Sequence, residues 1–198
     1  MTPDLDAWDP WPPSVVAHRL AGLDLPWCVV AGWAIDLCRG VPSRPHEDLE
    51  IAVPAGRFAE VRERLRDCDF AVPHDGRLLP PTPESMRTSH QTWAYERAVG
   101  RWRLDVFREP HDGDVWICRR DERIRRPYAE IVRHDPDGVP YLLPEVVLLF
   151  KAKGTRAKDE ADFATALPLL DDGARRWLDG ALALVHPAHP WRARLVTD

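Results

Sequence analysis

The chain has 198 residues, which is enough for one domain, or one domain with a substantial appendage, around a real hydrophobic core. Hydrophobic residues make up 44% of the sequence and charged residues 30%, a balance typical of soluble globular proteins. The formal net charge of −5 argues weakly against a general nucleic-acid binder, which usually carries a basic face, but leaves room for a local basic patch.

No apolar run approaches the length that crosses a membrane, and the first 13 residues are acidic and rich in proline where a secretory signal would be basic and then apolar. We therefore expect a cytoplasmic protein. The four cysteines form no Cys-x-x-Cys pair, so we expect reduced structural thiols rather than a zinc site.

Residues 1–13 are expected to form an irregular lead-in to the first half of the chain, which mixes helical and strand patterns. The prediction, in chain order, is a helix over Val15–Ala21 capped by Ser14, a strand over Trp27–Val30, a turn at Gly32, a helix over Trp33–Arg39, a strand over Asp48–Val53, a helix over Gly56–Asp67, a strand over Phe70–Val72 and a long loop over residues 73–90.

The second half begins with strands and ends with helices. The prediction continues with a hairpin of Gln91–Arg97 and Arg101–Arg108 joined near Gly100, strands over Val115–Cys118, Ala129–Val132 and Val139–Leu142, a helix from Pro144 that ends by Gly154, a helix over Lys158–Leu167, and a helix capped by Asp171 or Asp172 that runs to Val185. This order indicates an α/β (α+β) fold in which helices flank a mixed sheet, with a helical C-terminal part.

The strand over Asp48–Val53 carries the first chemical signal. Period two places Asp48 and Glu50 on one face and the apolar residues on the other. Two carboxylates on one face repel each other unless a cation lies between them, and Mg²⁺, which prefers oxygen ligands, is the natural candidate. A solvated strand edge is the plainer interpretation of an Asp-x-Glu pair taken alone. The turn at Gly32 favours the metal, because backbone N–H groups at the start of a helix can bind phosphate.

At this point the residues resemble a known family. The segment from Ala31 to Val53 looks like the nucleotidyltransferase superfamily of the DNA polymerase β type. It is most similar to the branch of aminoglycoside 2''-adenylyltransferases and lincosamide nucleotidyltransferases. The matching motif residues are Gly32, Trp33, Arg44, His46, Asp48 and Glu50. The strand Trp102–Phe107, the segment Tyr141–Glu145 and the segment Lys158–Phe163 extend the resemblance, which covers roughly residues 15–170.

The resemblance implies a nucleotidyltransferase fold with a catalytic domain over residues 1–143 and a helical C-terminal subdomain over residues 144–198. It also implies that Asp48, Glu50 and Asp105 are catalytic and bind Mg²⁺, with Asp105 as the general base. An ion pair of Asp105 with Arg101 or Arg103 is the alternative for that residue alone. Two residues depart from the family pattern: Ala31 replaces a usual glycine, and Glu50 replaces a more frequent Asp.

Phosphate binding needs cations, and lysine is confined to one place in this chain. The only three lysines are Lys151, Lys153 and Lys158, against 24 arginines. A compact ammonium suits phosphate where the wide guanidinium would not fit, so we expect Lys151 and Lys158 to contact the nucleotide. A solvated helix terminus is the alternative. Gly32, Trp33, Arg44 and His46 are also expected at the nucleotide, although a structural hydrogen bond suits His46 equally well.

Three further sets of aromatic, basic and acidic side chains could contact a substrate, but each has a simpler structural role. Trp93 and Tyr95 could flank an acceptor, but core packing is the commoner role of such aromatics. The five arginines of Arg119–Arg126 could bind a phosphate backbone, but a solvated loop is favoured. The acids Asp159, Glu160 and Asp162 and the segment Glu109–Asp114 could face a cationic acceptor, while solvated surfaces are the simpler account of each.

The sequence therefore predicts a Mg²⁺-dependent nucleotidyltransferase that transfers AMP (or another NMP) from ATP to a hydroxyl of a small molecule, such as an aminoglycoside-like or lincosamide-like compound. The alternatives are a toxin-like nucleotidyltransferase acting on tRNA or protein, and a non-catalytic nucleotide-binding regulatory module. We expect the nucleotide and a small-molecule acceptor as partners, with no membrane and no nucleic acid. The acceptor, the preferred nucleotide and the oligomeric state stay open.

Overall fold

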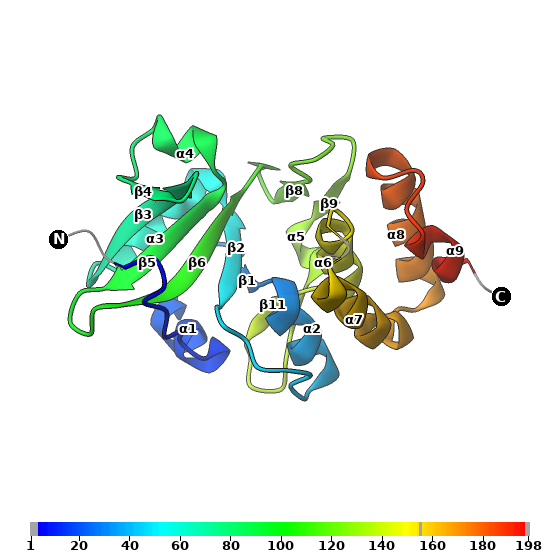
Figure 1. Cartoon of the computed structure of the whole chain (residues 1–198), viewed down its shortest axis with the longest axis horizontal. Helices are drawn as coiled ribbons and strands as arrows, with labels where there is room; N and C mark the ends of the chain where they lie inside the picture. The colour runs from blue at the N-terminus through cyan, green and yellow to red at the C-terminus, as the bar shows by residue number, and fades with distance from the viewer. Residues whose placement is uncertain (1–3, 155, 197–198) are drawn as a thin grey trace.

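The computed structural model describes residues 4–154 and 156–196, which contain a mixed sheet of eight strands and a small sheet of three (Figure 1). The strand order of the large sheet is β10-β11-β1-β2-β6-β5-β3-β4, and the small sheet is β7-β8-β9. The strands are β1 (Cys28–Val29), β2 (Glu50–Pro54), β3 (Cys68–His74), β4 (Arg77–Leu79), β5 (Gln91–Glu96), β6 (Arg101–Glu109), β7 (His111–Asp112), β8 (Val115–Ile117), β9 (Arg125–Pro127), β10 (Val132–His134) and β11 (Pro140–Leu142).

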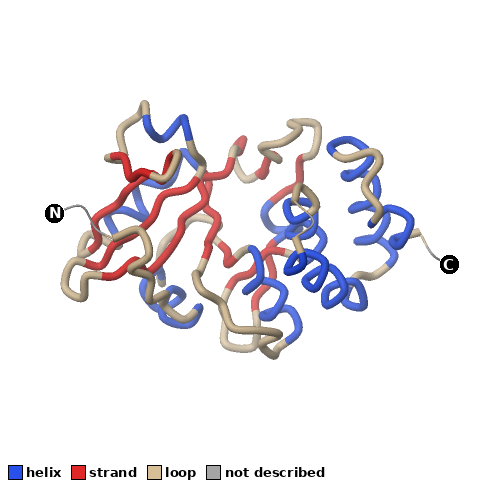
Figure 2. The backbone as a smooth tube through the Cα atoms, viewed as in Figure 1, coloured by secondary structure: helices blue, strands red, loops and turns tan. Residues whose placement is uncertain are grey.

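The helices lie on both sides of the large sheet and form all the regular structure described after β11 (Figure 2). They are α1 (Pro13–Leu20), α2 (Ala31–Arg39), α3 (Phe58–Arg64), α4 (Ser85–Thr88), α5 (Tyr128–Ile131), α6 (Pro144–Lys151), α7 (Ala157–Ala166), α8 (Asp172–Val185) and α9 (Trp191–Leu195), with short 3₁₀ turns over Ala55–Arg57 and Leu167–Leu169. No helix in the described ranges combines the length and the apolar character that crossing a membrane requires.

Strand β2 separates two hydrophobic cores because its side chains alternate between them. Leu49, Ile51 and Val53 are buried on one side, in the core that α1 and α3 cover. Ala52 is buried on the other side, in the core that α6 to α9 cover. Glu50 shares the face of Ala52, so the strand presents its acid towards the C-terminal helices.

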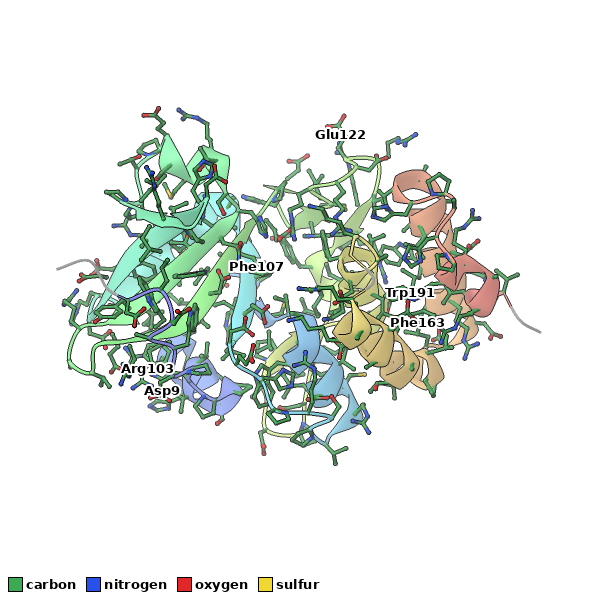
Figure 3. All side chains as sticks on the ribbon, viewed as in Figure 1. Asp9, Arg103, Phe107, Glu122, Phe163 and Trp191 are labelled. Carbon is green, nitrogen blue, oxygen red and sulfur yellow. The ribbon has the colours of Figure 1, made fainter. Side chains whose placement is uncertain are left out.

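The division into residues 1–143 and residues 144–198 stays a prediction. The second core joins the two parts, because it includes Cys28 and Ala52 of the sheet together with Val147 of α6 and Phe163 of α7. In Figure 3, Phe163 lies next to Trp191 of α9, and the two rings stack with centroids 4.3 Å apart. The end of the chain is thereby fixed to the helices that cover the sheet.

Most of the expected elements are present, with four corrections. Ser14 does not cap α1, because the helix begins at Pro13, which suits a first helical position. Residues 129–131 are helical rather than extended, because Pro127 fixes the entry to the single turn α5. Asp48 precedes β2 instead of opening it. The lead-in is irregular as expected, and its described residues contact the sheet: Trp8 bridges Trp102 of β6, and Asp9 forms an ion pair with Arg103 (Figure 3).

The fourth correction concerns residues 73–90, which contain β4 and α4 and are not a bare loop. Asp75 and Gly76 both have positive φ, of 46° and 70°, and join β3 to β4 in a two-residue hairpin. An Asp-Gly pair is a preferred sequence for such a turn because both residues tolerate left-handed backbone. The helix α9, after two His-Pro pairs, is a further element that the sequence analysis did not anticipate.

Candidate active site

Two of the predicted acids are direct partners across the sheet. Glu50 pairs with Asp105 in the parallel register of β2 and β6, and the backbone N–H of Asp105 donates to the carbonyl of Leu49 at 2.9 Å. Alternation along β6 places Asp105 on the same face as Phe107, which packs against the core of the C-terminal helices. The fold therefore brings both carboxylates to one face of the sheet.

Asp48 lies two residues before β2, exposed at the start of the same surface. Its charge acts on both of the other acids. Burial, followed by the charges of Asp48 and Asp105, raises the pKa of Glu50 to about 8. Burial is also the largest cause that raises the pKa of Asp105 to about 7, and Asp48 adds to it. A surface where neighbouring carboxylates raise the pKa of Glu50 and of Asp105 favours a cation.

Asp105 is the most buried of the three, at 4% exposed. Its Oδ2 accepts a hydrogen bond from the Gln91 side chain of β5, while its Oδ1 is buried without a hydrogen-bond partner among the described residues. It does not line the cavity described below, whereas Asp48 and Glu50 do. A buried carboxylate oxygen without a partner is costly, so Asp105 is set up to receive a further donor or a cation.

These observations bear on the predicted Mg²⁺ site. The described residues contain no group of three or more His, Cys, Asp or Glu side chains already arranged around a metal position. The donor chemistry nevertheless fits Mg²⁺, because all three candidates are carboxylates and one oxygen of Asp105 lacks a partner. The metal assignment of Asp48, Glu50 and Asp105 therefore stays a proposal.

A cavity of about 470 Å³ lies between the sheet and the C-terminal helices. One end of it is charged and open. The charged residues of this end are Arg44, Glu47, Asp48, Glu50, Lys151, Lys153, Arg156, Lys158 and Asp159, and the first turn of α2 and the first turn of α7 contribute to its rim. Two helix N-termini with clustered cations are suited to bind phosphate.

The first turn of α2 has unusual backbone geometry. Ala31 has φ of +55°, a left-handed conformation that favours glycine. Next to it, a Cβ atom on Gly32 would lie 2.5 Å from Arg44 Nη2 and 2.8 Å from His46 Cε1. Gly32 is therefore required for close packing of the loop that carries Arg44 and His46.

The structure gives His46 a structural role. Its Nε2 lies 2.7 Å from Oδ2 of Asp36, and its ring stacks on Trp33 with centroids 4.4 Å apart. The hydrogen bond from His46 keeps the pKa of Asp36 below its ordinary value although burial opposes this. Arg44 forms a long ion pair of 3.5 Å with Asp162 and also lines the cavity. These contacts fix the loop between α2 and β2.

The lysines differ in their surroundings. Lys151 Nζ lies 2.6 Å from Asp162 and 3.7 Å from Asp159, so two carboxylates already offset its charge. Lys158 is exposed in the first turn of α7, where the helix dipole disfavours a cation, and no ion pair to another described residue is formed. The charges of both lysines lower the pKa of Glu50, which places them near the carboxylates.

The structure also shows the surroundings of the aromatic and acidic residues that could have contacted an acceptor. Trp93 and Tyr95 pack against Trp102, as expected. Asp159 and Asp162 are buried and pair with Arg156 and Lys151, so they are not solvated. Glu160 is partly exposed and pairs with Arg194. From Glu109–Asp114, Glu109 is buried and paired with Arg119.

The arginines of Arg119–Arg126 all bond to groups within the protein, although Arg123 and Arg125 are exposed to solvent. Arg119 pairs with Glu109, and Arg120 donates to the carbonyls of Leu149 and Phe150 at the end of α6. Arg123 pairs with Asp121, Arg125 donates to the carbonyl of Glu122, and Arg126 pairs with Glu145. Acidic partners therefore offset the charges of Arg119, Arg123 and Arg126, and backbone carbonyls hold the side chains of Arg120 and Arg125.

Several contributors to the site were not anticipated from the sequence. Gln91 positions Asp105, Asp36 positions His46, and Asp162 joins Arg44 to Lys151. Gln91 is polar and lies directly opposite Phe107 in the β5–β6 hairpin, and this position could have indicated that it contacts the site. Asp36 and Asp162 gave a weaker signal, since an acid in a helix is usually solvated.

Comparisons with known proteins agree with this geometry. Residues 14–87 match the family model of aminoglycoside-2''-adenylyltransferase. The structure is similar to the solution structure of the antibiotic-resistance factor ANT(2'')-Ia, with a TM-score of 0.59 and 15% identity over 88% of this chain and 93% of that one. It is also similar to the lincomycin-bound lincosamide adenylyltransferase LnuA, with a TM-score of 0.55 and 15% identity over 80% of this chain and 97% of that one.

A third similar structure is ANT(2'')-Ia in complex with adenylyl-2''-tobramycin, with a TM-score of 0.59 and 13% identity over 86% of this chain and 97% of that one. No curated protein matches the chain by sequence. At these identities the structural matches establish the fold, and the family model covers the segment that carries Gly32, Asp48 and Glu50. The predicted resemblance is confirmed: the chain has the nucleotidyltransferase fold, and residues 14–87 match the aminoglycoside-2''-adenylyltransferase family model.

Proposed function

We propose that this chain is a nucleotidyltransferase that transfers AMP from Mg²⁺-bound ATP to a hydroxyl group of a small molecule. The observation that carries the proposal is the register of Glu50 opposite Asp105, beside a cavity whose open end gathers cations at two helix N-termini. Nucleotidyl transfer needs this combination, because the protein mainly positions the reactants and stabilises charge. The relatives' printed descriptions, which name adenylyl transfer to antibiotics, point to the same reaction.

Each residue has a defined task in this mechanism. The first turn of α2, together with Lys158 and Lys151, binds the triphosphate. Asp48, Glu50 and Asp105 would hold the Mg²⁺ ions, which neutralise charge on the reacting phosphate when bound. Asp105 accepts the proton of the acceptor hydroxyl, a role that suits a carboxylate because a bound metal ion would lower the pKa of that hydroxyl. Gln91 orients that carboxylate.

A small acceptor fits the charge distribution better than tRNA does. Three of the five arginines of Arg119–Arg126 pair with acids of the protein, which leaves few cations to follow a phosphate backbone, and the formal net charge of the chain is −5. Tight tRNA binding that weakens steeply with added salt, and label appearing on the RNA, would move the acceptor assignment to nucleic acid.

Pyrophosphate release tests the proposal. The protein is incubated with ATP, Mg²⁺ and a panel of hydroxyl-bearing compounds, and release is measured with and without each compound. Asp48→Asn should abolish the acceptor-dependent release while leaving the unfolding temperature nearly unchanged, because Asp48 is exposed. The matched control is Glu122→Gln, a neutralised acid in the exposed loop at the outer edge of Figure 3. Equal release by Asp48→Asn and the native protein would refute the catalytic role.

A further inference from the structure

The inner end of the same cavity has a different chemistry from its charged opening. Phe107 and Glu109 follow Asp105 on the same face of β6. Glu109 lies about 13 Å along the strand from Asp105. Trp116 of β8, Tyr128 of α5 and Phe150 of α6 complete the walls. Figure 3 shows Phe107 between the sheet and the C-terminal helices. We call these five residues, with Arg119, the inner chamber.

The inner chamber contains a few polar groups among aromatic walls. Glu109 is 3% exposed, pairs with Arg119 and accepts a hydrogen bond from the Trp116 indole at 3.4 Å. Tyr128 is 6% exposed, and its hydroxyl has no hydrogen-bond partner among the described residues. A buried hydroxyl without a partner costs free energy, so it is suited to bond to a ligand that enters the chamber.

The charges of the inner chamber do not favour a polycation. Its one carboxylate, Glu109, already has Arg119 as a partner, and Arg120 lies beside it along the same wall. Arg119 is held over the Phe150 ring, with its guanidinium carbon 4.1 Å from the ring centroid. A polyamine would face two guanidinium groups against one neutralised acid. An apolar ring would instead contact Phe107, Trp116 and Phe150.

The position of the chamber relative to the carboxylates indicates which substrate enters it. In phosphoryl and nucleotidyl transfer the attacking oxygen, the phosphorus and the leaving group lie roughly in line. The proposed triphosphate site is at the first turn of α2, next to Val30, whose N–H donates to the carbonyl of Glu50. The acceptor then approaches from the other side of the carboxylates. The inner chamber is on that side, because β6 runs from Asp105 towards Glu109.

We propose that the inner chamber binds the body of the acceptor, and that this acceptor is an alcohol with an apolar or aromatic ring and at most one cationic group, not a polyamine. This inference rests on the proposed nucleotidyl transfer. Tyr128 is the specificity-determining residue: its hydroxyl bonds to a polar atom of the acceptor, while Phe107 contacts the ring. The inference narrows the expected acceptors, because it disfavours aminoglycoside-like compounds.

Calorimetry separates binding from turnover. The protein, saturated with a non-hydrolysable ATP analogue and Mg²⁺, is titrated with phenyl glucoside, with lincomycin, which has one basic amine and an alkyl chain, and with tobramycin, a polyamine. We expect one of the first two to bind more tightly than tobramycin. Tyr128→Phe should weaken that binding about fivefold to tenfold, the value of one hydrogen bond, and leave the affinity for the ATP analogue unchanged.

Two further variants complete the test. Tyr95→Phe removes a hydroxyl from a tyrosine that packs on Trp102 outside the cavity, and it should change neither affinity. Phe107→Ala should weaken binding of the apolar probe by about tenfold or more, because it removes a wall of the chamber. Unfolding temperatures measured alongside show that each variant is folded.

The remaining outcomes distinguish a failure of this inference from a failure of the proposed function. Preferential tobramycin binding with normal AMP transfer would refute the acceptor class and leave the proposed function standing. A loss of affinity for the ATP analogue in Tyr128→Phe would assign the chamber to the nucleotide base. Absence of binding by all three probes would also refute the inference. Tyr128-dependent probe binding without AMP transfer to any compound would uphold the ligand class and refute the proposed function.

Discussion

Glu50 and Asp105 stand opposite each other in the parallel strands β2 and β6, and the charge of Asp105 helps to raise the pKa of Glu50 to about 8. In an ordinary fold such a pair would be selected against, since each ionised carboxylate destabilises the other. Lys151 and Lys158 offset part of this repulsion, and the proposed Mg²⁺ would offset the rest. This relationship, rather than either acid alone, supports the proposed catalytic centre.

The side chain at position 50 should tolerate shortening but not neutralisation. Glu50→Asp keeps the carboxylate and should retain or increase AMP transfer, because Mg²⁺ accepts either acid where the geometry can be met. Glu50→Gln removes the charge and should abolish transfer. Initial rates at saturating ATP measure both effects. Full activity of Glu50→Gln would show that this side chain is no metal ligand and would favour a non-catalytic nucleotide-binding module.

Lys158 and Lys151 should respond differently to truncation. Lys158→Ala should weaken ATP binding by roughly 1.5–3 kcal/mol, the value of a hydrogen bond to a charged group, with little effect on stability. Lys158→Arg should restore only part of the loss. Lys151→Ala should in addition destabilise the fold by about 3 kcal/mol, because it leaves Asp162, 2% exposed, with Arg44 alone.

Calorimetry with ATP and chemical denaturation of the same samples measure these two effects. An ATP affinity equal to that of the native protein in both alanine variants would show that neither lysine contacts the nucleotide. An ATP affinity that falls only in Lys151→Ala would indicate that the ion pair to Asp162, and not a phosphate contact, matters at this site.

Ala31→Gly should stabilise the protein modestly. The left-handed conformation at φ of +55° costs an alanine about 1–2 kcal/mol, while glycine adds about 0.4–1 kcal/mol of unfolded-state entropy. The net gain is up to about 1 kcal/mol. The matched control is Ala34→Gly in the same helix, which is buried and has no strain to relieve, and which should destabilise. Equal destabilisation by both variants would show that Ala31 is not strained.

His90 should make stability dependent on pH. Burial, and then the charges of Arg119 and Arg108, lower its pKa from 6.5 to about 3. The unfolded chain therefore binds a proton below about pH 6.5 while the folded chain does not, so the free energy of unfolding falls as pH decreases through this range. The slope from this residue is at most about 1.4 kcal/mol per pH unit.

His90→Gln should remove that contribution. Urea denaturation of both proteins at about pH 7 and about pH 5 measures it as the difference between their losses of stability. The variant should lose less stability than the native protein on acidification. An identical loss in the two proteins would mean that His90 can take up a proton in the folded state, and that the arginines beside it do not disfavour its charge.

The sequence predicted elements well where one periodic pattern covered the whole element. The hairpin of β5 and β6, the helix begun by Pro144 and the cap of α8 by Asp171 all agree with the structure. Short elements were missed because each spans too few residues to show a period. Pro127 starts the single turn α5, and the Asp75-Gly76 turn leads into the strand β4. The Asp-Gly pair was a usable signal.

For the candidate site, the residues from Gly32 to Glu50 and the distant Asp105 were predicted because their order and spacing resemble the motif of the nucleotidyltransferase superfamily, and their catalytic role stays a proposal. The partners of these residues were not found, because their contacts depend on tertiary packing. Asp162 meets Arg44 across 118 residues of chain, and Glu109 meets Arg119 only because β6 turns back through the small sheet. No local pattern encodes such pairs.

The most direct test of the central claim is the mass of the acceptor after reaction. The protein, ATP and Mg²⁺ are incubated with an acceptor that binds the inner chamber, and the recovered compound is analysed by mass spectrometry. The account predicts a gain of one AMP, which is lost in Asp105→Asn and retained in Glu122→Gln. A gain of a phosphate alone, or bound ATP with an unchanged acceptor under all conditions, would contradict it.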